Sequence, residues 1–452
     1  MKSIGTARDK VRSPFSKKER KQLLAWSKRA TDNDILSPTE RKILYEGGHY
    51  NYIFIARLSR LSEILDMLED HVSEEADLVQ NIKNIGYRCY LEARSNAGDA
   101  EAQFGLAEAL YYGFLGYEED EARALLWATK AAENGHLNAK CQLAKWHCRG
   151  LCGLEKNEVN AIEILEDAIE KGSMEACVIL GGWCRHGIGT KQNDRNAFAL
   201  YSKASNAGLN EGSYQLAACY LNGEGTAVNE ERAFQIIKSL AEAEYAPGMA
   251  MLGEFYFKGI GTQQSRERSI EWLRRAAELN DDQALLRLGE LYWRGDGVEE
   301  DNEQAFKFFQ QAWGFGNSAA NHYLGLIYYW GEGRDEDDEK AFSYFYDAVG
   351  AGIEKTNYFL GHCYYHGNGC TQDYDEAHKC FERAAETDPN AFFYLGECAR
   401  NGTGRKMSDE DAFEFYLRGA QHEDASAQMA LGRAFYFGEG VEENDVEAVK
   451  WC

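Results

Sequence analysis

Two histidines and a cysteine near residue 366 are the best candidates for metal chemistry in the sequence. His362 and His366 are four residues apart, and Cys370 follows them across a glycine-containing loop. This spacing would place both imidazoles on one face of a helix. Zinc, however, requires four convergent ligands, and no paired C-x-x-C motif accompanies these residues. We therefore expect buried or surface cysteines here, with no metal and no other cofactor. The same interpretation applies to a second group, which comprises His147, Cys148, Cys152, Cys184 and His186.

Signature motifs of common catalytic sites are absent from the sequence. It contains no G-x-x-x-x-G-K-[ST] phosphate-binding loop, no H-E-x-x-H motif and no G-x-S-x-G nucleophile elbow. Its G-x-G pairs recur at a regular interval, whereas a phosphate-binding loop would be a single exceptional feature. We therefore interpret the glycine pairs as turns and predict that the protein is not an enzyme.

The stretch from Ala284 to Asn317 indicates which elements carry these residues. Its first half combines the small residues Ala284 and Gly289 with an apolar stripe, which is typical of a helix approached closely by a neighbour. After the break at Gly295 to Gly297, apolar residues recur at i, i+3, i+4 and i+7, which predicts a second amphipathic helix. One helix pair cannot bury both of its apolar stripes, so copies of the pair must stack on one another.

The same pattern recurs ten times along the chain, at intervals of 35 to 37 residues. In each copy a glycine ends the first helix, a Leu-Gly or Leu-Ala pair precedes that glycine by seven residues, and a small residue opens the second helix. The helix-ending residues, which we call the phasing glycines, are Gly113, Gly150, Gly187, Gly223, Gly259, Gly295, Gly331, Gly367, Gly402 and Gly438. This regular phase predicts an all-α solenoid of about ten helix-pair repeats.

The sequence divides into three predicted regions. Residues 1–30 form a basic N-terminal arm, 31–98 an N-terminal helical cap, and 99–452 the ten repeats, the last of them incomplete. The arm contains ten Lys or Arg against Asp9 and Glu19, so its net charge is 10 − 2 = +8. It could contact nucleic acid or an anionic surface, fold back on the acidic repeats or form a solubilising tail, and the last two are favoured. Because the tenth copy stops early in its second helix, we expect the native chain to continue past Cys452.

Charge and hydropathy restrict the partners and the compartment. The net charge of −25 disfavours nucleic acid as the main partner, because most of the surface would repel a polyanion, and it favours a basic or amphipathic protein or peptide. No apolar segment follows the N-terminal charges, and no run approaches the ~20 apolar residues that span a bilayer. The twelve cysteines show no paired framework and are expected to be reduced. We therefore expect a cytoplasmic protein.

The repeat resembles a known family. The motif A-x-x-x-L-G-x-x-Y-x-x-G-x-G-V-x-x-D followed by A-x-x-x-x-x-x-A-A, as found in Ala284 to Ala312 and again in Ala320 to Ala348, is similar to the Sel-one-like repeat (SLR), a relative of the tetratricopeptide repeat. The resemblance covers about Asp99 to Cys452. It implies a right-handed α/α superhelical solenoid that acts as a scaffold or adaptor in protein complexes, often in signalling or stress pathways. Such a fold does not by itself identify a partner.

One branch of that family does not fit this chain. The resemblance to cysteine-rich bacterial members would imply one disulfide in each repeat and penicillin binding or β-lactam hydrolysis. The cysteines here do not recur as one pair per repeat, and no S-x-x-K motif supplies an acyl-transfer serine. We therefore do not expect that activity.

Aromatic residues recur two positions before the phasing glycines, as at Phe257, Trp293, Tyr329 and Tyr365. If the chain is arranged like related solenoids, the first helices line the concave surface and present these rings in a groove. Aromatic and arginine side chains are common anchors of binding sites. The alternative is that rings at the repeat period pack against the next repeat, which is the more frequent fate of a helical aromatic stripe.

We expect a non-enzymatic scaffold that binds a peptide or protein segment in this concave groove. The alternative is a targeting or regulatory solenoid whose catalytic domain lies beyond residue 452 or on a partner chain. The predicted groove residues are Glu254, Phe257, Glu290, Trp293, Arg294, Tyr329, Trp330, His362, Tyr365 and His366.

Overall fold

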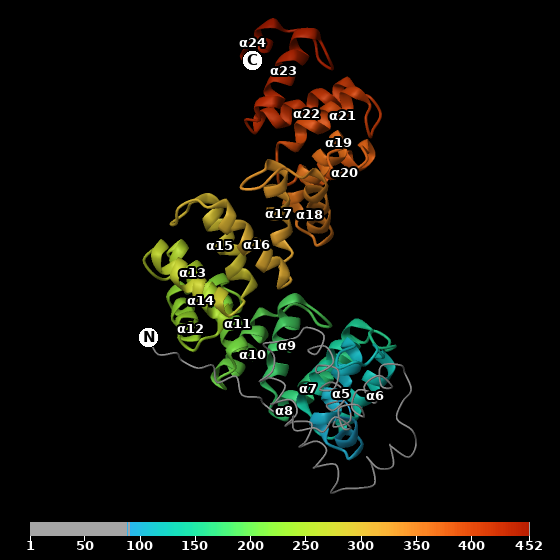
Figure 1. Cartoon of the computed structure of the whole chain (residues 1–452), viewed down its shortest axis with the longest axis vertical. Coiled ribbons are helices and arrows are strands. Elements are labelled where there is room, and N and C mark those ends of the chain that lie inside the picture. Colours follow the sequence, from blue (N-terminus) through green and yellow to red (C-terminus); the bar gives the residue numbers. More distant parts are fainter. Residues whose placement is uncertain (1–87, 89–90, 452) are drawn as a thin grey trace, which may run out of the picture. The chain divides into compact units, whose positions relative to one another are not determined.

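The computed structural model describes Arg88 and residues 91–451, and all regular structure within them is helical (Figure 1). This confirms the predicted all-α class. The basic arm at residues 1–30 lies outside the described residues, as does the predicted cap apart from Arg88 and residues 91–98. None of the described helices combines the length and apolarity that crossing a bilayer requires.

Each repeat consists of a first and a second helix, in the order that the sequence predicts. The first helices are α5 (Ala100–Tyr112), α7 (Leu137–Arg149), α9 (Met174–His186), α11 (Asn210–Asn222), α13 (Ala246–Lys258), α15 (Asp282–Arg294), α17 (Ala319–Trp330), α19 (Asn357–His366), α21 (Ala391–Asn401) and α23 (Ala425–Phe437). The second helices are α6 (Glu121–Glu133), α8 (Glu158–Glu170), α10 (Asp194–Asn206), α12 (Glu230–Glu242), α14 (Arg266–Glu278), α16 (Asn302–Gly314), α18 (Asp338–Gly350), α20 (Tyr374–Ala384), α22 (Asp409–Gln421) and α24 (Asp445–Trp451). A short 3₁₀ turn, η1 (Glu354–Thr356), precedes α19.

Local chemistry explains where these helices begin and end. All ten phasing glycines have φ between 66° and 76°, the left-handed conformation that closes a helix and that glycine adopts without strain. The polar loops then supply the N-caps of the second helices. Asp301, for example, accepts a hydrogen bond from the Gln304 backbone at 2.9 Å. The predicted helix-ending role of the phasing glycines is confirmed, and the loops preceding the second helices act as caps.

The second glycine of each G-x-G pair has a role that the sequence did not suggest. At Gly297 an added Cβ would lie 2.9 Å from the Arg266 Cβ, in the first turn of the preceding repeat's second helix. At Gly369 it would overlap the backbone carbonyl oxygen of Asp338, and Gly404 and Gly440 meet Tyr374 and Asp409 in the same way. These glycines are therefore contact points between consecutive repeats as well as turn residues.

In several repeats the glycine of the Leu-Gly pair makes room for a large side chain twenty residues later. An added Cβ at Gly289 would lie 2.5 Å from the Phe309 ring, and one at Gly181 would lie 2.7 Å from the Tyr201 ring. Where a repeat has alanine instead, as at Ala217, the corresponding second-helix residue is aliphatic, here Ile237. Glycine thus stands opposite the aromatic rings, although Gly253 makes the same close approach to the aliphatic Leu273.

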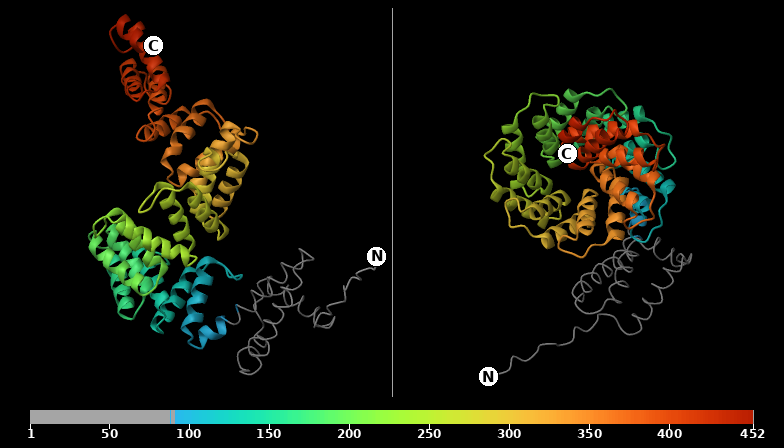
Figure 2. Two further views of the ribbon diagram at one scale, coloured as in Figure 1. Left: turned by 90° about the vertical axis from the view of Figure 1, so that its left-hand side faces the viewer. Right: turned by 90° about the horizontal axis from the view of Figure 1, so that it is seen from above.

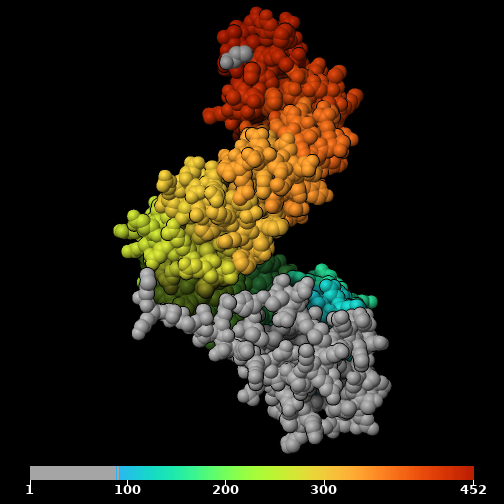
Figure 3. Space-filling view, in the orientation of Figure 1, coloured from blue at the N-terminus to red at the C-terminus, as the bar shows by residue number. Residues whose placement is uncertain are grey.

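The described residues divide into two compact units, with the boundary between Gln215 and Leu216. From α5 to α10 in the first unit and from α12 to α24 in the second, each helix packs against the one that follows it, and further views show successive pairs side by side (Figure 2). The first unit has a core around Leu106, Leu110 and Trp146. The second unit contains a larger aromatic core around Phe309 and Phe345, and its repeats form one continuous packed body in the space-filling view (Figure 3).

Candidate functional site

The predicted groove residues lie on four consecutive first helices of the second unit. Glu254 and Phe257 are on α13, and the corresponding positions on α15, α17 and α19 carry the remaining eight. The repeat spacing brings these positions into register, because each first helix packs on its own second helix through the same Leu-Gly contact. The structure therefore places them in one row, which we call the first-helix face.

Charged residues at the N-terminal end of this row neutralise one another. The Arg287 Nε lies 2.6 Å from a Glu254 carboxylate oxygen, and its Nη1 donates to Glu290 at 2.5 Å. Lys258 approaches the second oxygen of Glu254 at 3.5 Å. The Arg287 guanidinium also lies 4.2 Å from the centroid of the Phe257 ring, a cation–π distance. Both carboxylates therefore have cationic partners within the protein.

Tyr323 links this ion network to the aromatic core. It is 4% exposed, and its hydroxyl donates to Glu290 and accepts from the Lys355 ammonium at 3.0 Å. Its ring stacks on Phe309, with centroids 4.7 Å apart, and meets Trp293 edge to face at 5.6 Å. Burial raises the pKa of Tyr323, so the hydroxyl stays protonated and able to donate.

Aromatic and histidine side chains form the C-terminal part of the row. The Tyr329 hydroxyl lies 2.8 Å from His362 Nδ1, and the His362 and His366 rings are 4.3 Å apart. Both histidines also contact Tyr394, and Tyr365 meets the same ring at 5.5 Å. Burial lowers the pKa of His362 to about 4 and lowers that of His366, so both imidazoles are neutral near pH 7.

The predicted residues differ in how much surface they leave accessible. Trp293, Tyr329 and Tyr365 are half-buried and contact the next repeat, through Glu332, His362 and Tyr394 respectively. The neighbouring position, directly before the phasing glycine, is exposed at Arg294, Trp330 and His366, and Trp330 is 54% exposed. The half-buried rings thus serve inter-repeat packing, and the exposed column carries most of the accessible surface.

Sequence reasoning missed four residues that belong to this row. Arg287 and Tyr323 occupy the same position in consecutive repeats, one turn before Glu290 and its counterpart, and Tyr394 is the equivalent in the ninth repeat. Comparing the repeats at the position one helical turn before Glu290 would have found these three residues. Lys355 lies in η1, between repeats, where no repeat position marks it. Only the folded chain brings its ammonium to Tyr323.

Cys363 and Cys380 are buried thiols of the second unit. Burial raises the pKa of Cys363 to about 12 and of Cys380 to about 11, so both thiols are protonated near pH 7 and are poor nucleophiles. The ten cysteines within the described residues are free thiols. Across the same part of the chain, no three His, Cys, Asp or Glu side chains are grouped as metal ligands, so His362, His366 and Cys370 do not converge.

A buried histidine beneath this face makes the stability of the second unit depend on pH. His322 is 6% exposed and lies 3.0 Å from the Thr356 hydroxyl, and burial together with the nearby Lys355 charge lowers its pKa to about 3. Since an unfolded histidine titrates near 6.5, the folded state binds this proton less readily. The contribution of His322 to the free energy of unfolding is therefore fully present above about pH 6.5. It decreases as the pH drops toward 3. At pH 5 the loss from His322 should be about 2 kcal/mol.

Urea unfolding at pH 7 and pH 5 tests this prediction. We expect His322→Gln to reduce the pH dependence of the unfolding midpoint, whatever its effect on stability at pH 7. Part of the pH dependence should remain in the variant, because the pKa of His362 is also lowered by burial. An unchanged difference between the two pH values in the variant would show that His322 is not responsible.

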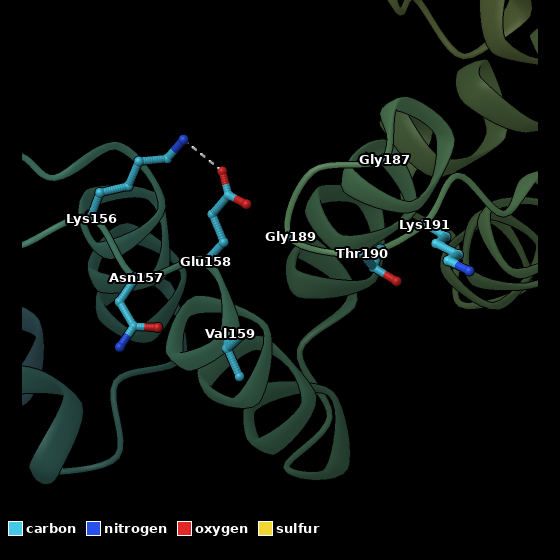
Figure 4. Close-up of a pocket in the computed structure, with 8 residues that line it drawn as sticks. All are labelled: Lys156, Asn157, Glu158, Val159, Gly187, Gly189, Thr190 and Lys191. Atoms are coloured by element: carbon cyan, nitrogen blue, oxygen red, sulfur yellow. Dashed lines mark ion pairs between the residues drawn. The ribbon is translucent and has the colours of Figure 1, made fainter.

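A separate depression of about 630 Å³ lies on the first unit, between the start of α8 and the loop from Gly187 to Lys191. Figure 4 shows Lys156 and Glu158 on one wall, joined by an ion pair of 2.8 Å, and Lys191 on the other. The charged groups on its walls do not converge. This depression therefore offers less for recognition than the first-helix face.

Comparison with known proteins follows the repeat boundaries seen in the structure. The Sel1 repeat family matches this chain ten times, at residues 100–136, 137–173, 175–209, 210–245, 246–281, 282–312, 318–349, 355–387, 389–424 and 425–452. A curated fungal protein, chitin synthase regulatory factor 1 of Schizosaccharomyces pombe, is 32% identical over 110 residues. That alignment covers 24% of this chain and 24% of the relative, so the chain spans about a quarter of the relative's length.

Solved structures of proteins with this repeat also match the chain. The crystal structure of c5321, a protective antigen of uropathogenic Escherichia coli with an SLR fold, matches with a TM-score of 0.53 and 26% identity, covering 80% of this chain and 77% of that one. A Sel1 repeat protein from Oxalobacter formigenes matches with a TM-score of 0.47 and 21% identity, covering 53% of this chain and 94% of that one.

Proposed function

Because the chain belongs to the Sel1 repeat family, we propose that it is a non-enzymatic scaffold that binds a peptide or protein segment on the first-helix face from α13 to α19. The observation that carries this proposal is the exposed column beside the packed aromatic row, with Arg294, Trp330 and His366 in consecutive repeats. Binding hot spots are often composed of a large exposed aromatic side chain flanked by charged groups and half-buried rings. A role as a cytoplasmic adaptor in signalling or stress response is part of the same proposal.

The chemistry of the partner is a separate question. A basic or amphipathic segment was expected from the acidic net charge. The pairing of Glu254 and Glu290 with Arg287 reduces the local attraction for a basic ligand. An amphipathic segment remains compatible with Trp330 and the half-buried rings around it.

Replacing Trp330 by alanine tests whether this face binds the partner. Trp330 is exposed on a first helix, and Trp313, at 50% exposed on α16, provides a matched control on a second helix. We expect Trp330→Ala to reduce recovery of a co-purifying partner at least about tenfold, the loss of about 1.4 kcal/mol that is common for a hot-spot tryptophan. Trp313→Ala should retain it. Quantitative mass spectrometry of proteins captured from the native source measures both.

Helical circular dichroism should be the same for both variants and the native protein, because neither indole is part of the buried core. The pair Trp293→Ala with Tyr329→Ala should also weaken capture. Equal capture by Trp330→Ala and Trp313→Ala would show that the first-helix face does not bind the partner.

A second candidate function is a targeting or regulatory solenoid for an enzyme. The name of the fungal relative, a chitin synthase regulatory factor, favours it, although the similarity covers only 110 residues. In that case the captured partner should be a catalytic chain whose rate changes when the solenoid is added. A partner without catalytic activity, or an enzyme whose rate the solenoid does not change, would leave the scaffold function alone.

A further inference from the structure

Two exposed aromatic rings lie on the first unit, at the junction between α5 and the loop that leads to α6 (Figure 1). Tyr112 is 59% exposed and Phe114 is 43% exposed, and they flank the phasing glycine Gly113. Their rings are stacked, with centroids 6.3 Å apart and an interplanar angle of 18°. Together they form a flat apolar surface that a partner can cover.

The ring pair is held in place by the core of the first unit. Tyr111 meets Tyr112 edge to face at 4.9 Å and packs against Trp146 at 5.0 Å, and Trp146 is 2% exposed. The backbone N–H of Phe114 donates to the Ala109 carbonyl at 3.2 Å. Because both ring-bearing positions are already ordered, a partner that covers them pays little for immobilising side chains.

The same loop brings a carboxylate back to this position. The Glu119 side chain lies against Gly113, since an added Cβ there would be 3.0 Å from the Glu119 Cγ. Glu118 and Glu119 are exposed, and among the described residues neither has a cationic partner, whereas Asp120 faces Arg123 at 4.0 Å. Unpaired acidic charge therefore lies beside the glycine that joins the two ring-bearing positions.

The second repeat has a loop of the same length with the opposite chemistry. A cation, an aliphatic side chain and another cation occupy the positions equivalent to the two rings and the carboxylate: Arg149, Leu151 and Lys156. Lys156 also lies over its phasing glycine, because an added Cβ at Gly150 would be 3.3 Å from the Lys156 Cβ. The loop therefore closes without a ring pair or a carboxylate, so folding alone does not require them in the first repeat.

A guanidinium group matches this arrangement, because it is planar, stacks on aromatic rings and donates to a carboxylate through several N–H groups. The chain contains such a stack in the same loop. The Arg88 guanidinium lies 4.2 Å from the centroid of the Tyr117 ring and donates to the Gly116 carbonyl at 2.7 Å. Arg88 is thereby engaged, whereas no cation of the described residues lies over Tyr112 or Phe114.

We propose that Tyr112, Phe114 and Glu119 bind an arginine side chain in a basic segment of a partner protein. The guanidinium stacks on the ring pair and donates to the carboxylate. The net charge of −25 attracts such a segment and repels an acidic one. This surface belongs to the first unit, whereas the first-helix face belongs to the second, so it is a further binding surface beyond the proposed function.

Fluorescence anisotropy of the full chain with labelled octapeptides tests this assignment. In the four probes glycine alternates with arginine, lysine, leucine or glutamate, and physiological ionic strength screens charges more than about 8 Å apart. We expect the arginine peptide to bind most tightly. Tyr112→Ala should weaken it about threefold, the size of an exposed cation–π contact, and Glu119→Lys about fivefold, because repulsion replaces attraction.

Two matched controls separate this surface from general attraction to an acidic protein. Tyr346→Ala removes a tyrosine that is 57% exposed on α18, and Glu155→Lys makes the same charge change in the equivalent loop of the second repeat. Both should leave the affinity for the arginine peptide unchanged within error. Circular dichroism should be the same for all four variants, because each replaced side chain is exposed.

Three results would overturn the assignment. The first is that Tyr112→Ala and Glu119→Lys bind the arginine peptide like their controls, which would leave only general electrostatic attraction. The second is that the leucine peptide binds as tightly, which would indicate an apolar occupant of the ring pair. The third is that the lysine or the glutamate peptide binds as tightly, because then the planar guanidinium is not what the surface recognises.

The variant Trp330→Ala distinguishes this inference from the proposed function. It should bind the arginine peptide like the native protein, because Trp330 belongs to the second unit. Weaker binding in Trp330→Ala with full affinity in Tyr112→Ala would place the basic ligand on the first-helix face. That result would reject the present assignment and leave the proposed function intact.

Discussion

Gly369→Ala should destabilise the second unit by about 2 to 5 kcal/mol. The substitution combines two costs at one position. Gly369 has φ of 69°, where a Cβ adds about 1 to 2 kcal/mol of strain. Its Cβ would also overlap the Asp338 carbonyl oxygen at the start of α18, and forced overpacking adds about 1 to 3 kcal/mol. Because the obstructing atom belongs to the backbone, no rotamer change can relieve the overlap.

Gly367→Ala is the matched control, two residues away in the same loop. Gly367 has φ of 75°, but the nearest atom to an added Cβ is the Gln372 Cβ at 3.4 Å, an ordinary contact. We expect this variant to lose only the strain energy, about 1 to 2 kcal/mol. Urea unfolding followed by circular dichroism gives both midpoints. If the two alanine variants unfold together, Gly369 does not act as an inter-repeat contact.

Gly289→Ala is expected to have the next largest effect, and a second substitution should reverse part of it. The added Cβ would meet the Phe309 ring at 2.5 Å, and Phe309 is fully buried, so the ring cannot swing out. Overpacking of this kind costs about 1 to 3 kcal/mol. Replacement of Phe309 by the smaller Ile reduces the crowding and recreates the Ala217 and Ile237 combination of the fourth repeat.

The double variant Gly289→Ala with Phe309→Ile should therefore be more stable than the sum of the two single changes predicts. Phe309→Ile alone leaves a cavity beside Gly289, which the alanine methyl group partly fills. The coupling free energy from a double-mutant cycle should be at least about 1 kcal/mol in favour of the pair. Additive effects would show that glycine at this position has a role other than making room for the ring.

The repeat architecture could be predicted well because its signals are local. The phasing glycine requires a left-handed conformation, and the Asp, Asn or Ser that precedes a second helix offers a side-chain acceptor, so both ends of a helix are specified within a few residues. No local pattern marks the contact between Gly369 and Asp338, because these residues belong to different repeats and only the stacking of the repeats brings them together. Gly369 therefore looked like a turn residue alone.

The sequence was sufficient to assign the candidate site residues to their helices. It was not sufficient to predict which of their charged groups form ion pairs. The periodic aromatic residues and the exposed column could be placed on the first helices from their spacing. Glu254 and Glu290 were predicted as groove residues, and a sequence does not show that Arg287 reaches both of them. Lys355 was overlooked, since it lies between repeats, where periodicity carries no information.

By itself, the sequence determined the helix pairs, their number and the residues that repeat at each position, since helix ends and amphipathic stripes depend on neighbours a few residues apart. Only the tertiary structure decided which charges are neutralised and which remain available. Ion pairs such as Arg287 with Glu254 join residues about one repeat apart, and their formation depends on side-chain reach and burial at the repeat interface. For that reason the residues of the first-helix face could be named from the sequence, whereas the pairing of Arg287 with Glu254 and Glu290 became visible only in the fold.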